Sequence, residues 1–510
     1  MLKNLSLHRY GFGRFMLALF TVLLLAAPAV AADEGELTFD RWYVLRLQGE
    51  RIGHAHMSMR ESDERVITSN ETHMSIRRGQ ATMHIAQTTR FTETRDGKPI
   101  EARSRMKLGQ MAVNKTMRFG EDEHELISEQ GGRETRQPVP ASEEAWLPPA
   151  AAQRYIEQRM DEGAERIELR TFDLSMGAEP FEMMLAVLGE EAVEVMGKVV
   201  PATMWRAEMS SMPGVTATEY VDRQGQTLKT TVQVMPGMEV EMLAADEQVA
   251  TAEVDPPEML ASMLVEPAGA IDAPRELRRA VYQLRLDDSV DPQRFKLPRT
   301  GYQRIVWGDQ RTAKVVTDLD QPVPAGEDLP GDAHRAASSM IDHDDPKVRA
   351  LLKEALGADG EDLDEFAKAK RLRAFVQRYV NEKDLSVGLA TASEVARTRQ
   401  GDCTEHAVLL TALLRAADIP SRTATGLLYV DQFLGREGVF GGHMWTQAWL
   451  PTQTDGGHTW IDLDATLPQQ AYDAAHITLA VSAMDDAAPT NALLEQLPLM
   501  QAMEIEIVHP

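Results

Sequence analysis

The chain has 510 residues, a formal net charge of −26, 43% hydrophobic residues and one cysteine. Such an acidic chain repels polyphosphates, and no basic patch is interleaved with aromatic residues, which argues against nucleic-acid binding. Because a single thiol cannot form an intramolecular disulfide, an apolar core must stabilise the fold. The length is sufficient for two to four domains.

The first 31 residues have the pattern of a secretory signal peptide. Three basic residues accompany an apolar run over residues 15–27, which is too short to span a bilayer comfortably. Ala29-Val30-Ala31 then provides a small-x-small cleavage site. We therefore expect cleavage after Ala31 and a periplasmic or secreted mature protein without a membrane span.

Residues 32–254 are predicted to form a β-rich N-terminal domain. Apolar and polar residues alternate, and glycines lie at the tips of the expected hairpins, where tight turns require positive φ. The pair Pro148-Pro149 predicts one helix, which ends at about Glu162. The expected hairpins cover residues 42–57, 89–103 and 219–232.

Histidines gather near the start of this domain. His54 and His56 lie two residues apart, so they share one strand face and could ligate zinc. No cysteine and no carboxylate at a fixed spacing accompany them. We interpret them as exposed or half-buried strand histidines and predict no metal site and no cofactor.

Residues 255–335 are predicted to be a linker followed by a small β unit. The linker, up to residue 274, is rich in proline and acidic residues. A strand over residues 281–286 and a hairpin over residues 302–317 make up the β unit. This unit separates the N-terminal domain from the last predicted domain, residues 336–510.

The last domain begins with a run of acidic residues, Asp342 to Asp345, before Pro346. A calcium site is one interpretation, but no loop with ligand spacing surrounds the run. An aspartate cap with proline in the first turn is the favoured interpretation. Further helices are expected over residues 363–379 and 392–397, and the tail, residues 471–510, is expected to end in an edge strand over residues 503–508.

Cys403, the only cysteine, follows Gly401-Asp402 and opens an apolar stretch that reads as a buried helix. The unsatisfied amides and the dipole at a helix start favour thiolate over thiol. The alternative is a small packed hydrophobic residue. The position of Cys403 predicts a nucleophile.

Two expected strands downstream supply a base and an acid. His443 follows two glycines and opens the first strand, and the second strand contains Asp462 and Asp464 on one face. A thiol needs a base, and the base needs a group that fixes its tautomer. His406, in the Cys403 helix, is a rival base, and the residues alone leave Asp462 and Asp464 open as the acid.

Four ordered blocks resemble the bacterial transglutaminase-like superfamily. They are Gly-Asp-Cys-Thr-Glu-His-Ala, Leu-Leu-Arg-Ala-Ala-Asp-Ile-Pro-Ser-Arg, Gly-His-Met-Trp and Trp-x-x-x-Asp-Ala-Thr, within residues 340–470. The resemblance implies an α+β fold: a papain-like core, preceded here by antiparallel β-rich domains. It places the nucleophile at Cys403, the base at His443 and the orienting acid at Asp464. One departure is Asp418, where relatives often have glycine; aspartate tolerates this helix C-terminal position.

These residues predict acyl transfer at peptide or amide bonds through a thioester. Water as acceptor gives a protease or amidase, and an amine gives a transglutaminase; we favour hydrolysis because an exported site contacts abundant water. The expected substrate is a protein or peptide of the cell envelope. The alternative from another class is a non-catalytic binding scaffold.

Overall fold

The computed structural model describes most of the chain as two compact units, each treated by itself below. The first comprises mainly residues up to 257, and the second mainly residues from 258 onward. The predicted signal peptide lies outside the described residues. These are residues 35–79, 81–109, 111–212, 215–235, 238–258, 261–288, 292–294, 296–382, 388, 390–452, 457–468, 472–485, 500 and 502–509.

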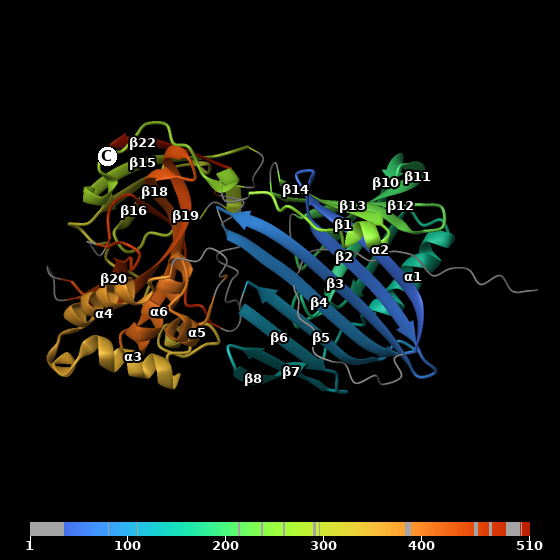
Figure 1. Cartoon of the computed structure of the whole chain (residues 1–510), viewed down its shortest axis with the longest axis horizontal. Helices are drawn as coiled ribbons and strands as arrows, with labels where there is room; N and C mark the ends of the chain where they lie inside the picture. The colour runs from blue at the N-terminus through green and yellow to red at the C-terminus, as the bar shows by residue number, and fades with distance from the viewer. Residues whose placement is uncertain are drawn as a thin grey trace, which may run out of the picture. The chain divides into compact units, whose positions relative to one another are not determined.

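The N-terminal unit contains one long antiparallel sheet of 14 strands (Figure 1). Neighbours along the chain are neighbours in the sheet, and β1 also pairs with β14, so the order is β8 to β1 followed by β14 to β9. The strands are β1 (Glu36–Leu47), β2 (Glu50–Glu61), β3 (Arg65–Arg78), β4 (Ala81–Thr94), β5 (Pro99–Leu108), β6 (Met111–Arg118), β7 (Glu123–Gln130), β8 (Arg133–Pro140), β9 (Arg166–Thr171), β10 (Phe181–Val195), β11 (Lys198–Met209), β12 (Thr216–Val221), β13 (Thr227–Met235) and β14 (Met238–Ala245).

Local sequence explains most of this unit. At the β1–β2 turn, Gln48 and Gly49 have φ angles of 52° and 83°, the left-handed pair that a tight hairpin requires. Helix α1 (Pro149–Asp161) has proline in its first turn, as expected. Helix α2 (Glu247–Ala250) is a single turn capped by Asp246. The three predicted hairpins are present as β1–β2, β4–β5 and β12–β13.

The second unit contains two four-stranded antiparallel sheets. Apolar side chains of both sheets, among them Tyr282, Phe440 and Ile477, share one buried core. One sheet has the order β16-β17-β15-β22 and the other β20-β19-β18-β21. The strands are β15 (Arg279–Leu286), β16 (Gln303–Trp307), β17 (Thr312–Asp318), β18 (Ser421–Phe433), β19 (Arg436–Pro451), β20 (His458–Leu463), β21 (His476–Ser482) and β22 (Met503–His509).

Helix α6 (Cys403–Ala416) is the centre of the helical layer. Helices α3 (Pro346–Leu356), α4 (Glu365–Tyr379) and α5 (Ala392–Thr398) pack around it (Figure 1). Almost every α6 side chain from Glu405 onward is buried, which explains why its sequence is apolar all round. It also packs against β18 and β19, and the Thr446 hydroxyl of β19 donates to the Ala407 carbonyl at 3.0 Å.

Several predictions for this unit are confirmed at single residues. The Asp345 side chain accepts from the Lys347 amide at 2.7 Å, so it caps α3 as expected. Asp418 has a φ of 62°, the left-handed conformation expected after α6. Strand β22 lies at a sheet edge, beside β15.

The tail also contains a strand that the sequence analysis did not predict. Residues 476–482 form β21, which pairs with β18 in the sheet next to α6. The predicted boundary between residues 335 and 336 falls inside the second unit, because β15, β16 and β17 join β22 from the tail. An antiparallel β-rich region followed by an α+β region is otherwise the architecture that was expected.

Candidate active site

The start of α6 is built around a reciprocal cap. The Asp402 carboxylate accepts from the Thr404 amide at 3.0 Å, and Glu405 returns a bond to the Asp402 amide at 2.9 Å. Gly401 precedes it with a φ of 147°, and a Cβ there would lie 2.3 Å from the Glu405 Cβ. The glycine therefore leaves room for the buried capping glutamate that fixes the helix start.

Cys403 lies in the first turn of this helix and is partly exposed. The backbone N–H of Met444 in β19 donates to its sulfur, which places Cys403 beside the residue that follows His443. Burial raises the pKa of the Cys403 thiol well above its ordinary value, and the Asp402 charge adds to the rise. Burial and the neighbouring carboxylates thus oppose the effect of the helix start, which by itself favours the thiolate.

His443 is oriented by a carboxylate. Its Nε2 lies 2.9 Å from Oδ2 of Asp464, which directly follows β20. Because the carboxylate accepts, Nε2 carries the proton, and Nδ1 is the basic nitrogen left for a proton acceptor role. The side chain of His443 is 8% exposed and that of Asp464 is fully buried.

Asp464 is hydrogen-bonded at both oxygens. Its Oδ1 accepts from the amide and the hydroxyl of Thr466, each at 2.7 Å. Burial alone would raise the pKa of Asp464, but His443 and then His476 hold it well below its ordinary value. The acid is thus ionised and fixed in position.

Neither rival residue has the geometry of a triad member. Asp462 accepts from the Trp445 and Gln447 side chains at 2.8 Å each and from the Tyr302 amide at 3.0 Å. It is 1% exposed, so these three donors take the place of water around its carboxylate. His406 is buried, and its Nδ1 donates to the Asp402 carbonyl at its own helix start.

The sequence analysis missed the residues on the far side of Asp464. His476, at the start of β21, places its Nε2 3.2 Å from Asp464 Oδ2, the oxygen that also binds His443. Its Nδ1 faces the Asp473 carbonyl and carboxylate, each at 3.0 Å. Arg275 lies 2.8 Å from the other Asp473 oxygen. The alternation His-Ile-Thr-Leu-Ala-Val could have predicted the strand, but its sequence does not show these contacts.

His443, Asp464 and His476 bring three possible metal ligands together, with donor atoms within 4.8 Å of one another. His476, however, faces hydrogen-bond acceptors at both ring nitrogens, so both carry protons and neither has a lone pair for a metal. Burial by itself would lower the pKa of His476. The hydrogen bonds to Asp464 and Asp473 have the larger effect, and they raise this pKa to about 9. The hydrogen-bonded arrangement therefore fits these residues better than a metal site.

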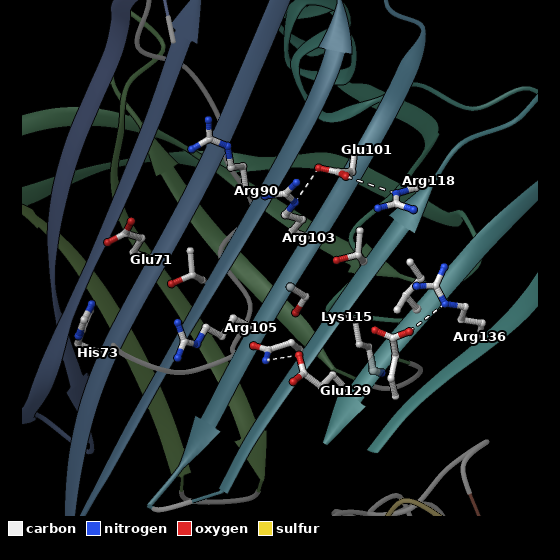
Figure 2. Close-up of a pocket in the computed structure, with 16 residues that line it drawn as sticks. Glu71, His73, Arg90, Glu101, Arg103, Arg105, Lys115, Arg118, Glu129 and Arg136 are labelled. Atoms are coloured by element: carbon white, nitrogen blue, oxygen red, sulfur yellow. Dashed lines mark hydrogen bonds and ion pairs between the residues drawn. The ribbon is translucent and has the colours of Figure 1, made fainter. Parts of the chain in front are cut away.

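A hollow of about 700 Å³ lies on the N-terminal sheet, in the other unit (Figure 2). Glu101 pairs with Arg103 and lies within 3.9 Å of Arg118, and Glu134 pairs with Arg136, as the dashed lines in Figure 2 indicate for Glu101. Ion pairs within β5 and β8, and one between β5 and β6, thus neutralise part of its charge. The predicted chemistry lies on α6 and β19 instead.

Residues 353–465 match the family model described as the transglutaminase-like superfamily. The chain therefore contains a transglutaminase-like domain, and the predicted fold class, with this domain after a β-rich region, is confirmed. The match includes Cys403, His443 and Asp464. It supports a thiol enzyme in general terms.

Solved structures give weaker likenesses. A β-barrel-like protein of unknown function from Brucella abortus is 15% identical over 41% of this chain and 95% of its own, with a TM-score of 0.32. A protein from Cytophaga hutchinsonii, proposed to be a cysteine protease, is 19% identical over 44% and 83%, with a TM-score of 0.27. Scores this low support no argument. No curated protein matches the sequence.

Within the described residues, no helix is both long and apolar enough to cross a membrane.

Proposed function

We propose that the chain is an exported cysteine peptidase or amidase that uses Cys403, His443 and Asp464 as a catalytic triad. The observation that carries the proposal is the alignment of His443. Its Nε2 bonds Asp464 at 2.9 Å, and the amide of the next residue bonds the Cys403 sulfur. This arrangement supplies a nucleophile, a base and an orienting acid from three separate elements.

Acylation begins from a neutral thiol. As the Cys403 sulfur attacks the substrate carbonyl carbon, the thiol proton passes to Nδ1 of His443, and the Asp464 charge stabilises the resulting imidazolium. The carbon–nitrogen bond then breaks, and Nδ1 returns the proton to the leaving amine. A thioester on Cys403 remains. The raised thiol pKa makes this base assistance necessary.

The start of α6 can also stabilise the oxyanion. The cap bonds the amides of Thr404 and Glu405, which follow Cys403. The Cys403 amide lies in the same first turn, where helix N–H groups have no acceptor within the helix. It is therefore placed to donate to the tetrahedral oxygen, together with the positive end of the helix dipole.

Deacylation uses water in this proposal. His443 accepts a proton from water as the water oxygen attacks the thioester carbon, and it then protonates the departing Cys403 sulfur. The expected substrates are proteins or peptides of the cell envelope, because residues 1–31 have the pattern of a signal peptide. Amino-terminal sequencing of protein from the periplasmic fraction should begin at Ala32.

The deciding experiment offers the enzyme both acceptors. The mature protein is incubated with a glutamine-bearing protein and a labelled primary amine, and ammonia, new peptide termini and bound label are measured. We expect ammonia or new termini without stable label. Cys403→Ala should abolish both, whereas Thr404→Ser, which keeps the hydroxyl bonded to Asp402, should retain activity.

Two results would contradict the proposal. Stable incorporation of label that depends on Cys403 would identify a transglutaminase and overturn hydrolysis. Activity that persists in Cys403→Ala would overturn the thiol mechanism.

A further inference from the structure

Beyond Asp464, the hydrogen-bonded residues continue into the interior of the second unit. Asp464 Oδ2 accepts from His443 on one side and from His476 on the other, at 2.9 and 3.2 Å. Asp473 accepts from the opposite nitrogen of His476, and Arg275 binds Asp473 in turn. The result is a line of alternating charges that starts at the proposed base.

The surroundings of His476 restrict its ring to one orientation. The side chains of His476 and Asp473 are fully buried. The Tyr472 ring stacks on the imidazole with a centroid distance of 4.2 Å, and Trp445 meets it edge-on at 5.1 Å. Both ring nitrogens have acceptors, so rotation of the ring would break these hydrogen bonds. Because the site is buried, water would not replace them.

The charged residues beyond Asp464 also offset the free-energy cost of burying the Asp464 carboxylate. A fully buried carboxylate is expensive unless cations and donors surround it. A protonated His476, which bonds Asp464 Oδ2 at 3.2 Å, supplies such a cation, and Asp473, itself paired with Arg275, accepts from the other nitrogen of His476.

We propose that His476, held by Asp473 and Arg275, is a positioning residue that keeps Asp464 ionised and aimed at His443. This inference rests on the proposed function of the triad. His476 does not touch the reacting atoms, so it acts only through Asp464. Among the described residues, Asp462, Tyr472, His443 and Arg373 are further titratable groups near Asp464 or His476, and Tyr282 lies near Asp473.

Three variants separate positioning from packing. His476→Ala removes the donor to Asp464, and His476→Gln can place an amide N–H near Nε2 without the charge. Ile477→Val is the control: it trims a buried side chain on the same strand, in the core shared by the two sheets. With a peptide substrate, we expect kcat of His476→Ala to fall about 10- to 100-fold with little change in KM.

His476→Gln should recover part of the lost kcat, since it restores a hydrogen bond to Asp464. The pH–rate profile of His476→Gln should differ from that of the wild type, because the variant lacks the positive charge beside Asp464. Ile477→Val should keep the wild-type kcat and profile. Unchanged kcat and pH profile in both His476 variants, or an equal loss in Ile477→Val, would overturn the proposal.

Alkylation of Cys403 by iodoacetamide tests the same point without any substrate. The chain has one cysteine, so every adduct reports this site. We expect the pH dependence of the rate to shift in His476→Gln and to stay as in the wild type in Ile477→Val. If the wild type cleaves no amide yet this shift occurs, the proposed function fails while the positioning role stands. If cleavage occurs but neither profile shifts, the positioning role fails alone.

Discussion

One buried carboxylate from each unit illustrates two opposite ways of burying such a group. In the N-terminal unit, Glu219 on β12 is fully buried, and neither of its oxygens has a hydrogen-bond partner among the described residues. In the second unit, the Asp464 side chain is equally buried, but both of its oxygens accept hydrogen bonds. His443 and His476 donate to Oδ2, and Thr466 donates to Oδ1. Burial alone therefore does not mark a site; the connection of a buried charge to a base and a nucleophile does.

The pKa directions follow from this difference. Without a partner, burial raises the pKa of Glu219 to about 8, so it is mainly protonated at neutral pH. With two histidines, Asp464 keeps its charge. Burial of Glu219 therefore lowers the stability of the fold by an amount that varies with pH, whereas the ionised Asp464 is suited to orienting a base.

The largest effect is expected at the connected carboxylate. Asp464→Asn should lower kcat by about 10⁴-fold, because donors face both oxygens of Asp464: the amide must turn its NH₂ toward the histidines or toward Thr466, and it also lacks the negative charge. Circular dichroism should show a folded protein. A variant with more than a tenth of wild-type kcat would break the comparison.

A smaller effect, on stability, is expected at the unconnected carboxylate. Glu219 has an ordinary pKa of 4.5 and a folded pKa of about 8, so between these values the folded state holds a proton that the unfolded state has released. Stability of the N-terminal unit should therefore fall as pH rises from 4.5 to 8, by a few kcal/mol in order of magnitude.

Glu219→Gln should remove this decline, as measured by urea unfolding across the same pH range. The matched control is Glu208→Gln, a partly exposed position on the neighbouring strand β11 whose carboxylate pairs with Arg206. Parallel pH profiles for wild type and Glu219→Gln would show that the carboxylate is not protonated in the folded protein.

Asp462 sharpens the comparison, because it is buried and hydrogen-bonded but not joined to the base. In Asp462→Asn, the amide must turn a donor toward Tyr302 N–H or toward the Trp445 and Gln447 donors. We expect a loss of about 1–3 kcal/mol in stability and a much smaller loss of kcat than in Asp464→Asn. Thermal unfolding and turnover measured together test this; the reverse pattern would exchange the roles of the two acids.

The smallest effect is expected at Asp418, which belongs to no charge network. Its φ of 62° is easier for glycine, so Asp418→Gly should stabilise the second unit by up to about 1 kcal/mol without changing kcat. Thermal unfolding measures the gain. A stability loss would mean that the aspartate side chain contributes more than its backbone strain costs.

The sequence predicted the parts of this molecule that local rules control. Glycines at turns predicted the hairpins, and prolines and aspartates predicted the helix starts. The order of Cys403 and His443 along the chain predicted the candidate site. The choice of Asp464 required the family resemblance, since period two puts Asp462 on the same face. His476 was missed because its role depends on Arg275, about two hundred residues earlier in the chain, and on a strand taken for part of a tail.

The pairing of β22 with β15 determines when the core of the second unit can form during folding. Tyr282 and Leu284 of β15 meet Ile507 and Ile505 of β22, and these side chains belong to the core that both sheets share. That core cannot close until residues 503–509 have been synthesised, however early the helices form. Contacts so distant in sequence slow folding, and until then the edge of β15 opposite β17 lacks its strand partner β22.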